Sequence, residues 1–159
     1  MNGFWGDLPT WITTLAVGFA AIQLRQSHRS QVKEDERLRR AQASGVWAWA
    51  GSFRGDENNE YGFVAVNSSP APIRNVKVGL SLHGREIESE LLQILPPGEY
   101  FVKRDSDTWD YPLSLAEYGK PVRPYAQSPR YLVHWMEFED AAGTAWRYSS
   151  GRGLEPARA

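Results

Sequence analysis

The sequence predicts a mainly β protein: an antiparallel Ig-like β-sandwich of about seven strands, preceded by one long N-terminal α-helix. Three observations support this prediction. Residues 9–24 are uncharged and mostly apolar, and residues 25–43 are highly charged and contain no glycine or proline. From residue 46 onward, short stretches of alternating apolar and polar side chains are separated by turn residues. The first two patterns favour a helix, and the third is typical of antiparallel strands.

Composition and charge exclude several classes of protein. The formal net charge is −1, so the chain offers no basic footprint and we expect no nucleic-acid partner. The chain contains no cysteine, which excludes disulfides, thiolate metal sites and a cysteine nucleophile. Seven Trp, seven Tyr and six Phe supply enough large side chains for a core without such cross-links.

Residues 1–24 form the N-terminal segment and contain a candidate transmembrane helix. Its apolar run of about 16 residues would measure about 24 Å as a helix, which is short for a bilayer core of about 30 Å. Basic residues follow the run, whereas a cleaved signal peptide carries them before it. This asymmetry predicts a single-pass cell-membrane protein with its N-terminus outside and its β-domain in the cytoplasm. The predicted anchor residues are Trp11, Ile12, Leu15, Val17, Phe19, Ile22, Leu24, Arg25 and Arg29.

The same segment has a second interpretation, as a helix that packs on protein. Four of its apolar residues lie close to one helical stripe: Ile12, Leu15, Phe19 and Ile22. Thr14 and Gly18 are four residues apart, a spacing that lets two helices approach closely and form a homo-oligomer. Membrane lipid and a protein partner therefore both remain as candidate partners of this helix.

The rest of the chain divides into three further segments. Residues 25–44 are predicted to form a charged helical stalk that continues the first helix, and Gly45 is predicted to end it. The β-sandwich domain is predicted to span residues 45–152. Residues 153–159 are predicted to be a disordered tail.

Seven stretches within the β-domain have the alternation or the apolar content of strands. They are residues 46–53, 61–67, 74–82, 87–94, 99–103, 131–139 and 144–148. The stretch 131–139 is apolar on both faces, which predicts a central strand, and residues 140–143 (DAAG) predict the hairpin turn that follows it.

Residues 105–130 interrupt the strand pattern. A connection this long in a compact domain is usually functional or disordered. Residues 112–118, closed by Gly119, have the composition of a short helix. Aromatic side chains in a proline-rich loop make good binding hot spots, so five residues are predicted to bind a partner: Trp109, Tyr111, Tyr118, Tyr125 and Arg123. The alternative is that these aromatics cap one end of the sandwich.

No motif for catalysis or for a cofactor is present in the sequence. It has no glycine-rich phosphate loop, and no serine lies in an elbow-type motif. His134 is predicted to share a strand face with Met136 and Phe138, which is typical of a packed histidine rather than a metal ligand. We therefore expect no enzyme activity, no catalytic residue, no metal and no cofactor. A hydrolase, built from His83 or His134 and an acid, is the less favoured alternative.

Several features together resemble a known group of proteins. They are Pro9 and Trp11 opening the apolar helix, the charged helix after it, LPPG at 95–98 and DAAGTAWRY at 140–148. The sequence thereby resembles small single-pass membrane proteins of actinobacteria and their phages that carry a C-terminal β-sandwich domain and have no assigned activity. The resemblance implies a membrane-tethered β-sandwich. It implies no activity and no functional residues.

The expected function is a non-enzymatic, membrane-tethered protein-interaction module. Its helix would hold the β-sandwich at the cytoplasmic face of the membrane, where tethering raises its effective concentration for an unknown protein partner. The alternative is a structural subunit of a larger assembly, in which the N-terminal helix packs on protein partners rather than on lipid.

Overall fold

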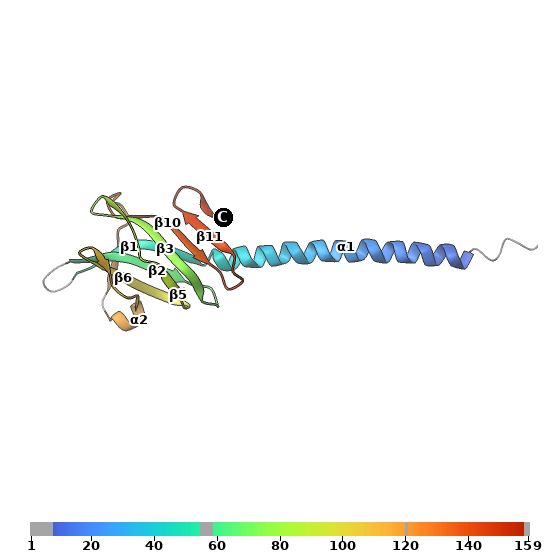
Figure 1. The fold of residues 1–159 in the computed structure, drawn as a ribbon, viewed down its shortest axis with the longest axis horizontal. Coiled ribbons are helices and arrows are strands. Elements are labelled where there is room, and N and C mark those ends of the chain that lie inside the picture. Colours follow the sequence, from blue (N-terminus) through green and yellow to red (C-terminus); the bar gives the residue numbers. More distant parts are fainter. Residues whose placement is uncertain (1–7, 55–58, 120, 158–159) are drawn as a thin grey trace, which may run out of the picture. The chain divides into compact units, whose positions relative to one another are not determined.

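The computed structural model of this chain describes residues 8–54, 59–119 and 121–157, and it gives only the backbone for residues 8–18 and 20–22 (Figure 1). Contacts between residues divide the chain into two compact units, Met1–Arg40 and Ala41–Ala159. The second unit is called the β-domain below. The predicted β-domain began at residue 45, but its core already includes Ala43, which is 1% exposed.

Helix α1 spans Leu8–Ala43, so its residues 8–40 belong to the first unit and its residues 41–43 belong to the β-domain. Figure 1 shows it as a single unbroken helix, which confirms the predicted long N-terminal helix. Residues 23–41 are exposed along its length. Gly45 follows the end of α1, and its N–H donates to the carbonyl of Gln42 at 3.1 Å. This bond satisfies one of the carbonyls that a helix end leaves without an intrahelical partner.

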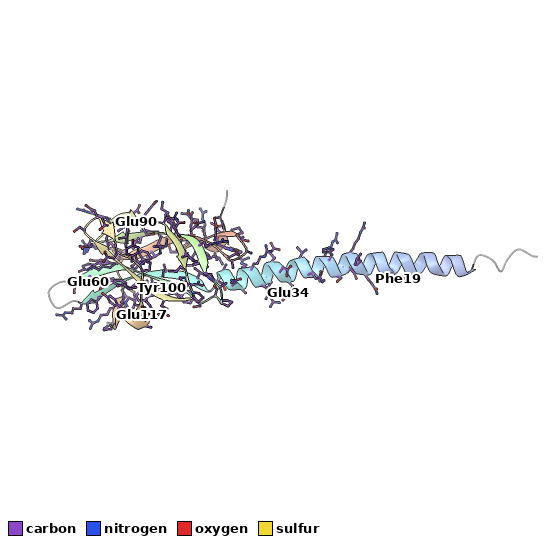
Figure 2. All side chains as sticks on the ribbon, turned by 60° about the horizontal axis from the view of Figure 1, so that its bottom comes forward. Phe19, Glu34, Glu60, Glu90, Tyr100 and Glu117 are labelled. Carbon is purple, nitrogen blue, oxygen red and sulfur yellow. The ribbon has the colours of Figure 1, made fainter. Side chains whose placement is uncertain are left out.

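The predicted anchor residues are described only in part. Phe19 is 67% exposed and Leu24 70% exposed, and Arg25 and Arg29 are exposed as well. Figure 2 shows Phe19 projecting from the helix. The side chains of the others lie outside the described residues: Trp11, Ile12, Leu15, Val17 and Ile22. In the part of the chain that the structure describes, no helix is both long and apolar enough to cross a membrane, so the predicted span is not confirmed.

The β-domain contains two antiparallel sheets. The first sheet has the order β7-β6-β2-β1-β9, with β8 also paired to β6, and the second has the order β12-β11-β10-β3-β4, with β5 also paired to β3. The strands of the first sheet are β1 (Val46–Arg54), β2 (Asn59–Asn67), β6 (Gly98–Asp105), β7 (Thr108–Trp109), β8 (Leu113–Ser114) and β9 (Val122–Pro124). Those of the second are β3 (Ile73–Leu82), β4 (Arg85–Glu88), β5 (Leu92–Leu95), β10 (Leu132–Glu139), β11 (Ala145–Ser149) and β12 (Gly153–Pro156).

Both sheets contribute to one hydrophobic core. On β3 the alternating residues Val76, Val78, Leu80 and Leu82 are all buried, and Phe63 of β2 is fully buried in the same cluster. Side chains two apart on a strand point to the same face, so this alternation places one face of β3 in the core. The mainly β fold with two antiparallel sheets is confirmed, whereas the Ig-like detail is not.

Strand β10 and its turn agree with their sequence pattern. β10 lies between β11 and β3, so the prediction of a central strand is confirmed. In the DAAG turn, Asp140 is only 2% exposed, and its carboxylate accepts hydrogen bonds from the N–H groups of Ala142 and Thr144 and from Trp146 Nε1, each at 2.9 Å. A buried carboxylate needs such donors, and here they hold the turn against β11.

The described residues contain twelve strands rather than about seven. One reason is that the stretch 87–94, predicted as one strand, is divided into β4 and β5, which both pair with β3. The division occurs at Ser89, whose N–H donates to the Val78 carbonyl at 2.7 Å and whose hydroxyl accepts from the Val78 N–H at 2.9 Å. The serine hydroxyl replaces a backbone acceptor, so ordinary strand pairing stops there.

The predicted orientation of His134 was wrong. The pairing of β10 with β3 shifts between Val133 and Trp135, which leaves His134 as the extra residue of a β-bulge. Such a bulge changes the face to which the following residues point. Val133 and Met136 are buried in the core, whereas the His134 ring is hydrogen-bonded to Ser81.

The prediction of a disordered tail over residues 153–159 was also wrong. Gly153–Pro156 forms β12 and pairs with β11, and the N–H of Ala157 donates to the Ala145 carbonyl at 2.9 Å. Leu154 is half-buried and packs against the core, which supplies the apolar contact that holds this strand. Residues 158 and 159 lie outside the described residues.

Candidate functional site

The five residues predicted to bind a partner have separate sets of contacts. Trp109 and Tyr111 line one groove. Tyr118 lies on helix α2 (Leu115–Tyr118) and packs beneath the first sheet, Tyr125 belongs to a stack of tyrosines, and Arg123 is exposed on β9. The structure therefore brings together only the first two.

Trp109 links the two sheets. It lies on β7 of the first sheet, and its Nε1–H donates to the carbonyl of Glu88 on β4 of the second sheet at 2.9 Å. Its ring meets the edge of the buried Phe63 ring at a centroid distance of 5.2 Å, and the Arg104 guanidinium lies 5.3 Å from its centroid. The contacts of Trp109 therefore agree better with the alternative, in which the aromatics cap one end of the β-domain, than with a partner-binding role.

Tyr111 is almost free of contacts. It is 88% exposed and lies after β7, at the rim of a cavity of about 430 Å³. Leu91 (49% exposed), just before β5, and Ile94 (57% exposed), on β5, line the same cavity. Apolar residues of both sheets line the cavity, and we call it the Tyr111 groove: Leu91, Leu92, Ile94, Val102, Trp109 and Tyr111.

Sequence reasoning missed Leu91 and Ile94. Both lie in the stretch 87–94, which was predicted only as one more strand. The available signal was the run Leu91–Leu92 next to Ile94, which leaves more apolar residues than one buried strand face can cover. Their meeting with Tyr111 depends on the arrangement of two sheet edges, which no local pattern reveals.

Tyr118 is held within the β-domain. Its ring packs against Phe53 and Phe101 at centroid distances of 5.6 and 5.5 Å, and its hydroxyl donates to Glu60 Oε2 at 2.7 Å. Burial, followed by the bond to the Glu60 carboxylate, holds the pKa of the Tyr118 hydroxyl well above its ordinary value. Gly119 caps α2 in a left-handed conformation, φ 66°, which agrees with the predicted short helix.

Tyr125 takes part in a stack of three tyrosines. Its ring lies 4.0 Å from that of Tyr131 at an interplanar angle of 12°, and Tyr131 stacks on Tyr61 at 5.6 Å. The Tyr131 hydroxyl is hydrogen-bonded to Nδ1 of His83 at 2.8 Å. Burial raises the pKa of Tyr131, and the neighbouring tyrosines add to this effect. Tyr125 thus stabilises the end of the β-domain rather than presenting a free ring.

The two histidines of the β-domain bear on the hydrolase alternative. His134 Nε2 is 2.7 Å from the hydroxyl of Ser81, and Glu86 and Glu88 line the same depression. A catalytic serine requires a base that is oriented by an acid. Among the described residues no carboxylate is hydrogen-bonded to His83 or His134. The described part of the chain also contains no group of three or more His, Cys, Asp or Glu arranged to hold a metal.

Comparison with known proteins finds no matching family model, no matching curated protein and no matching solved structure.

Proposed function

We propose that this protein is a non-enzymatic interaction module that α1 tethers to a membrane, with the β-domain presented at the cytoplasmic face. The observation that carries the proposal is the Tyr111 groove, which exposes apolar side chains from both sheets. Exposed apolar clusters with an aromatic anchor are typical of protein-binding sites. The structure supports this use of the groove through the exposure of Tyr111, Leu91 and Ile94.

An extended peptide segment fits the groove best. Among the described strands, β5 pairs only with β3, so its other edge offers backbone N–H and C=O groups to an added strand. A peptide that pairs with this edge would place alternate side chains over Ile94 and against Tyr111. Main-chain bonds would supply affinity, and the apolar groove would select large hydrophobic side chains.

The membrane tether is supported by the sequence around the start of α1. The uncharged run at residues 9–24 is followed by Arg25 and Arg29, which would meet anionic headgroups at about 1 kcal/mol each. The resemblance to small actinobacterial single-pass proteins agrees with this proposal. An Ig-like sandwich is the architecture we propose for the β-domain, because its two antiparallel sheets share one core.

A second candidate function is a structural subunit whose helix packs on protein. The observation that favours it lies in the charged part of α1, where Val32 and Leu38 are each 59% exposed. A bilayer that ends near Arg25 would leave both side chains in water, whereas a protein partner along the helix would cover them. Helices in proteins gain most of their stability from such packing.

Membrane fractionation with a carbonate wash, followed by protease treatment of intact spheroplasts, tests the tether. If α1 anchors the chain in lipid, the protein stays in the washed membrane and its β-domain is protected from protease. Release by carbonate would contradict the tether and favour the second candidate. A variant with a charge inside the uncharged run, Phe19→Asp, should be released under the first proposal, because an acid near the middle of a membrane helix opposes insertion by about 2.5–3.5 kcal/mol.

A further inference from the structure

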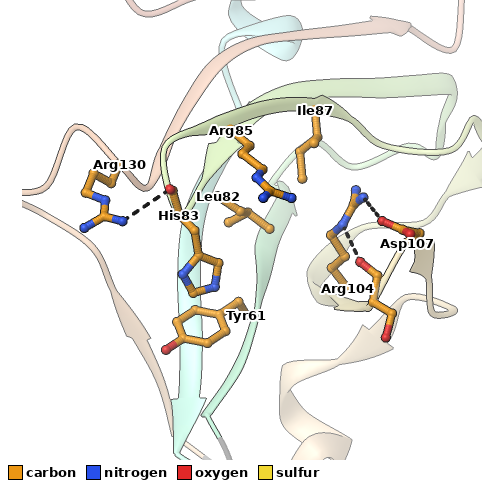
Figure 3. A pocket seen from close by; sticks show the side chains of 9 residues that line it. Tyr61, Leu82, His83, Arg85, Ile87, Arg104, Asp107 and Arg130 are labelled. Carbon is orange, nitrogen blue, oxygen red and sulfur yellow. Dashed lines mark hydrogen bonds and ion pairs between the residues drawn. The ribbon is translucent and has the colours of Figure 1, made fainter.

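A second cavity, of about 630 Å³, lies between two hairpin tips of the β-domain (Figure 3). One tip is the turn between β3 and β4, and the other is the turn between β6 and β7. Arg85 enters the cavity from the first tip and Arg104 from the second, so each sheet contributes one guanidinium group. The volume lies within the range of about 300–1,000 Å³ that is typical of small-molecule sites.

The cavity carries an excess of positive charge. Three arginines line it, Arg85, Arg104 and Arg130, against one carboxylate, Asp107. Asp107 is fully exposed and lies 3.5 Å from Arg104, a geometry in which solvent screens the attraction. Arg130 donates to the carbonyl of His83 at 3.4 Å, and Arg85 forms no ion pair with any described residue. A concave site with uncompensated like charges concentrates anions.

Both hairpin tips hold their residues in fixed positions. His83 and Gly84 have φ values of 55° and 84°, the pair of positive angles that defines a tight type I′ turn. Ser106 at the other tip also has a positive φ, 54°. Two residues other than glycine in this conformation at the mouth of one cavity are unusual, and such conformations cluster at ligand sites. The ring of His83 is further held by Tyr131, through the 2.8 Å hydrogen bond to Nδ1.

The floor and one wall of the cavity are apolar or aromatic. Figure 3 shows Leu82 and Ile87 beside the Arg85 guanidinium, and Tyr61 under the His83 ring. The Tyr61 and His83 rings meet edge to face at a centroid distance of 4.3 Å. A bare inorganic anion would use only the arginine side of this cavity, so the lining fits a ligand with one charged end and one apolar end.

We propose that this cavity binds a phosphate monoester, with its phosphoryl group between Arg85 and Arg104 and its apolar portion against Tyr61 and Ile87. Two guanidinium groups from different strands suit a dianion. Arg85 can present its whole planar fork to the phosphoryl oxygens. Arg104 donates through Nε to the Ser106 carbonyl at 3.1 Å and through Nη2 to Asp107 at 3.5 Å, so it contributes its remaining N–H groups. A single carboxylate would be satisfied by one fork and would leave the other arginine uncompensated. This site is separate from the Tyr111 groove, and its occupancy does not depend on the tether.

Calorimetric titration of the full-length chain with phenyl phosphate tests the proposal. We expect saturable one-to-one binding, and Arg85→Gln should raise the Kd about tenfold or more, because it removes a charge-assisted pair. The matched control is Arg123→Gln, which removes another exposed arginine, on β9, that does not line the cavity. Its Kd should stay within about twofold of the parent value, since solvent screens charges at a distance.

Three results would overturn the proposal. The first is an absence of saturable binding at millimolar phenyl phosphate. The second is an equal weakening of binding in Arg85→Gln and Arg123→Gln, which would indicate diffuse charge attraction. The third is that inorganic phosphate binds as tightly as phenyl phosphate, which would mean that the apolar wall of the cavity contributes nothing to binding. Arg85 is exposed, so Arg85→Gln is expected to keep the parent melting temperature, and a thermal melt verifies this.

Discussion

At the scale of single residues, Trp109 at the end of β7 and Tyr111 two positions later have opposite surroundings. Trp109→Ala should lower the free energy of unfolding by about 2–4 kcal/mol, because it removes a packed ring together with the bond to the Glu88 carbonyl. Tyr111→Ala should change it by less than about 0.5 kcal/mol, since the ring is 88% exposed. Urea denaturation of both variants measures the difference. Equal losses of the free energy of unfolding in the two variants would contradict the conclusion that Trp109 is packed and Tyr111 is not.

Tyr118 gives a second prediction at this scale, concerning pH. Its pKa is raised in the folded protein above the ordinary value of 10.0. The neutral hydroxyl therefore stabilises the fold fully below about pH 10, and this contribution is lost as the pH rises further, because the unfolded chain ionises first. Tyr118→Phe should lower the free energy of unfolding near neutral pH. Above pH 10, the free energy of unfolding of the variant should decline less steeply with pH than that of the parent protein. Chemical denaturation between pH 8 and about pH 11 measures how the free energy of unfolding of each protein changes with pH. Parallel curves for variant and parent would contradict the raised pKa of Tyr118.

At the scale of elements, the outer face of the second sheet depends on one close contact between β3 and β10. A Cβ on Gly79 would lie 2.2 Å from the Trp135 ring, and the Arg147 guanidinium lies 4.7 Å from the centroid of that ring. Gly79→Ala should therefore cost about 1–3 kcal/mol of stability through overpacking. The matched control is Gly151→Ala, where a Cβ meets nothing within 4 Å.

A double-mutant cycle identifies the cause of that loss. In a Trp135→Ala background, Gly79→Ala should cost much less, giving a coupling of about 0.5–3 kcal/mol, because the clashing ring is gone. Thermal or urea denaturation of the four chains measures it. If the two losses simply add, strain at another contact is responsible.

The elements also show what the sequence pattern could predict. Residues 131–139 are apolar on both faces, and this correctly placed β10 in the middle of a sheet. The same pattern gave the wrong face for His134, because a β-bulge adds one residue without changing the composition of the strand. The break at Ser89 was missed for a related reason, since its hydroxyl acts on Val78, a residue eleven positions earlier in the chain.

At the scale of the whole molecule, the candidate site shows where local patterns stop being informative. The aromatic loop was recognised from the sequence, but only Tyr111 of its aromatics is fully exposed. Leu91 and Ile94 join it because the edges of two sheets meet, and Arg85 and Arg104 of the second cavity come from two hairpins in different sheets. Such placements follow from long-range pairing, which the period of a single strand does not encode.

The β-domain should fold without most of α1. The residues of its core lie within Ala41–Ala159, and residues 23–41 of the helix are exposed. A chain that begins at Ala41 should therefore keep the far-ultraviolet circular dichroism of strands and a cooperative thermal transition. It should also lose attachment to membranes or to an assembly. A shortened chain that fails to fold would indicate that α1 is part of the domain rather than its tether.

Site-specific photocrosslinking tests most directly the central claim that the Tyr111 groove is the surface that binds a partner. A photoreactive phenylalanine analogue is introduced at residue 111 of the full chain in cells and, as a control, at Leu132 on β10, which is 41% exposed. We predict one discrete protein adduct from position 111 and none from position 132. No adduct at position 111, or the same adducts from both positions, would contradict it.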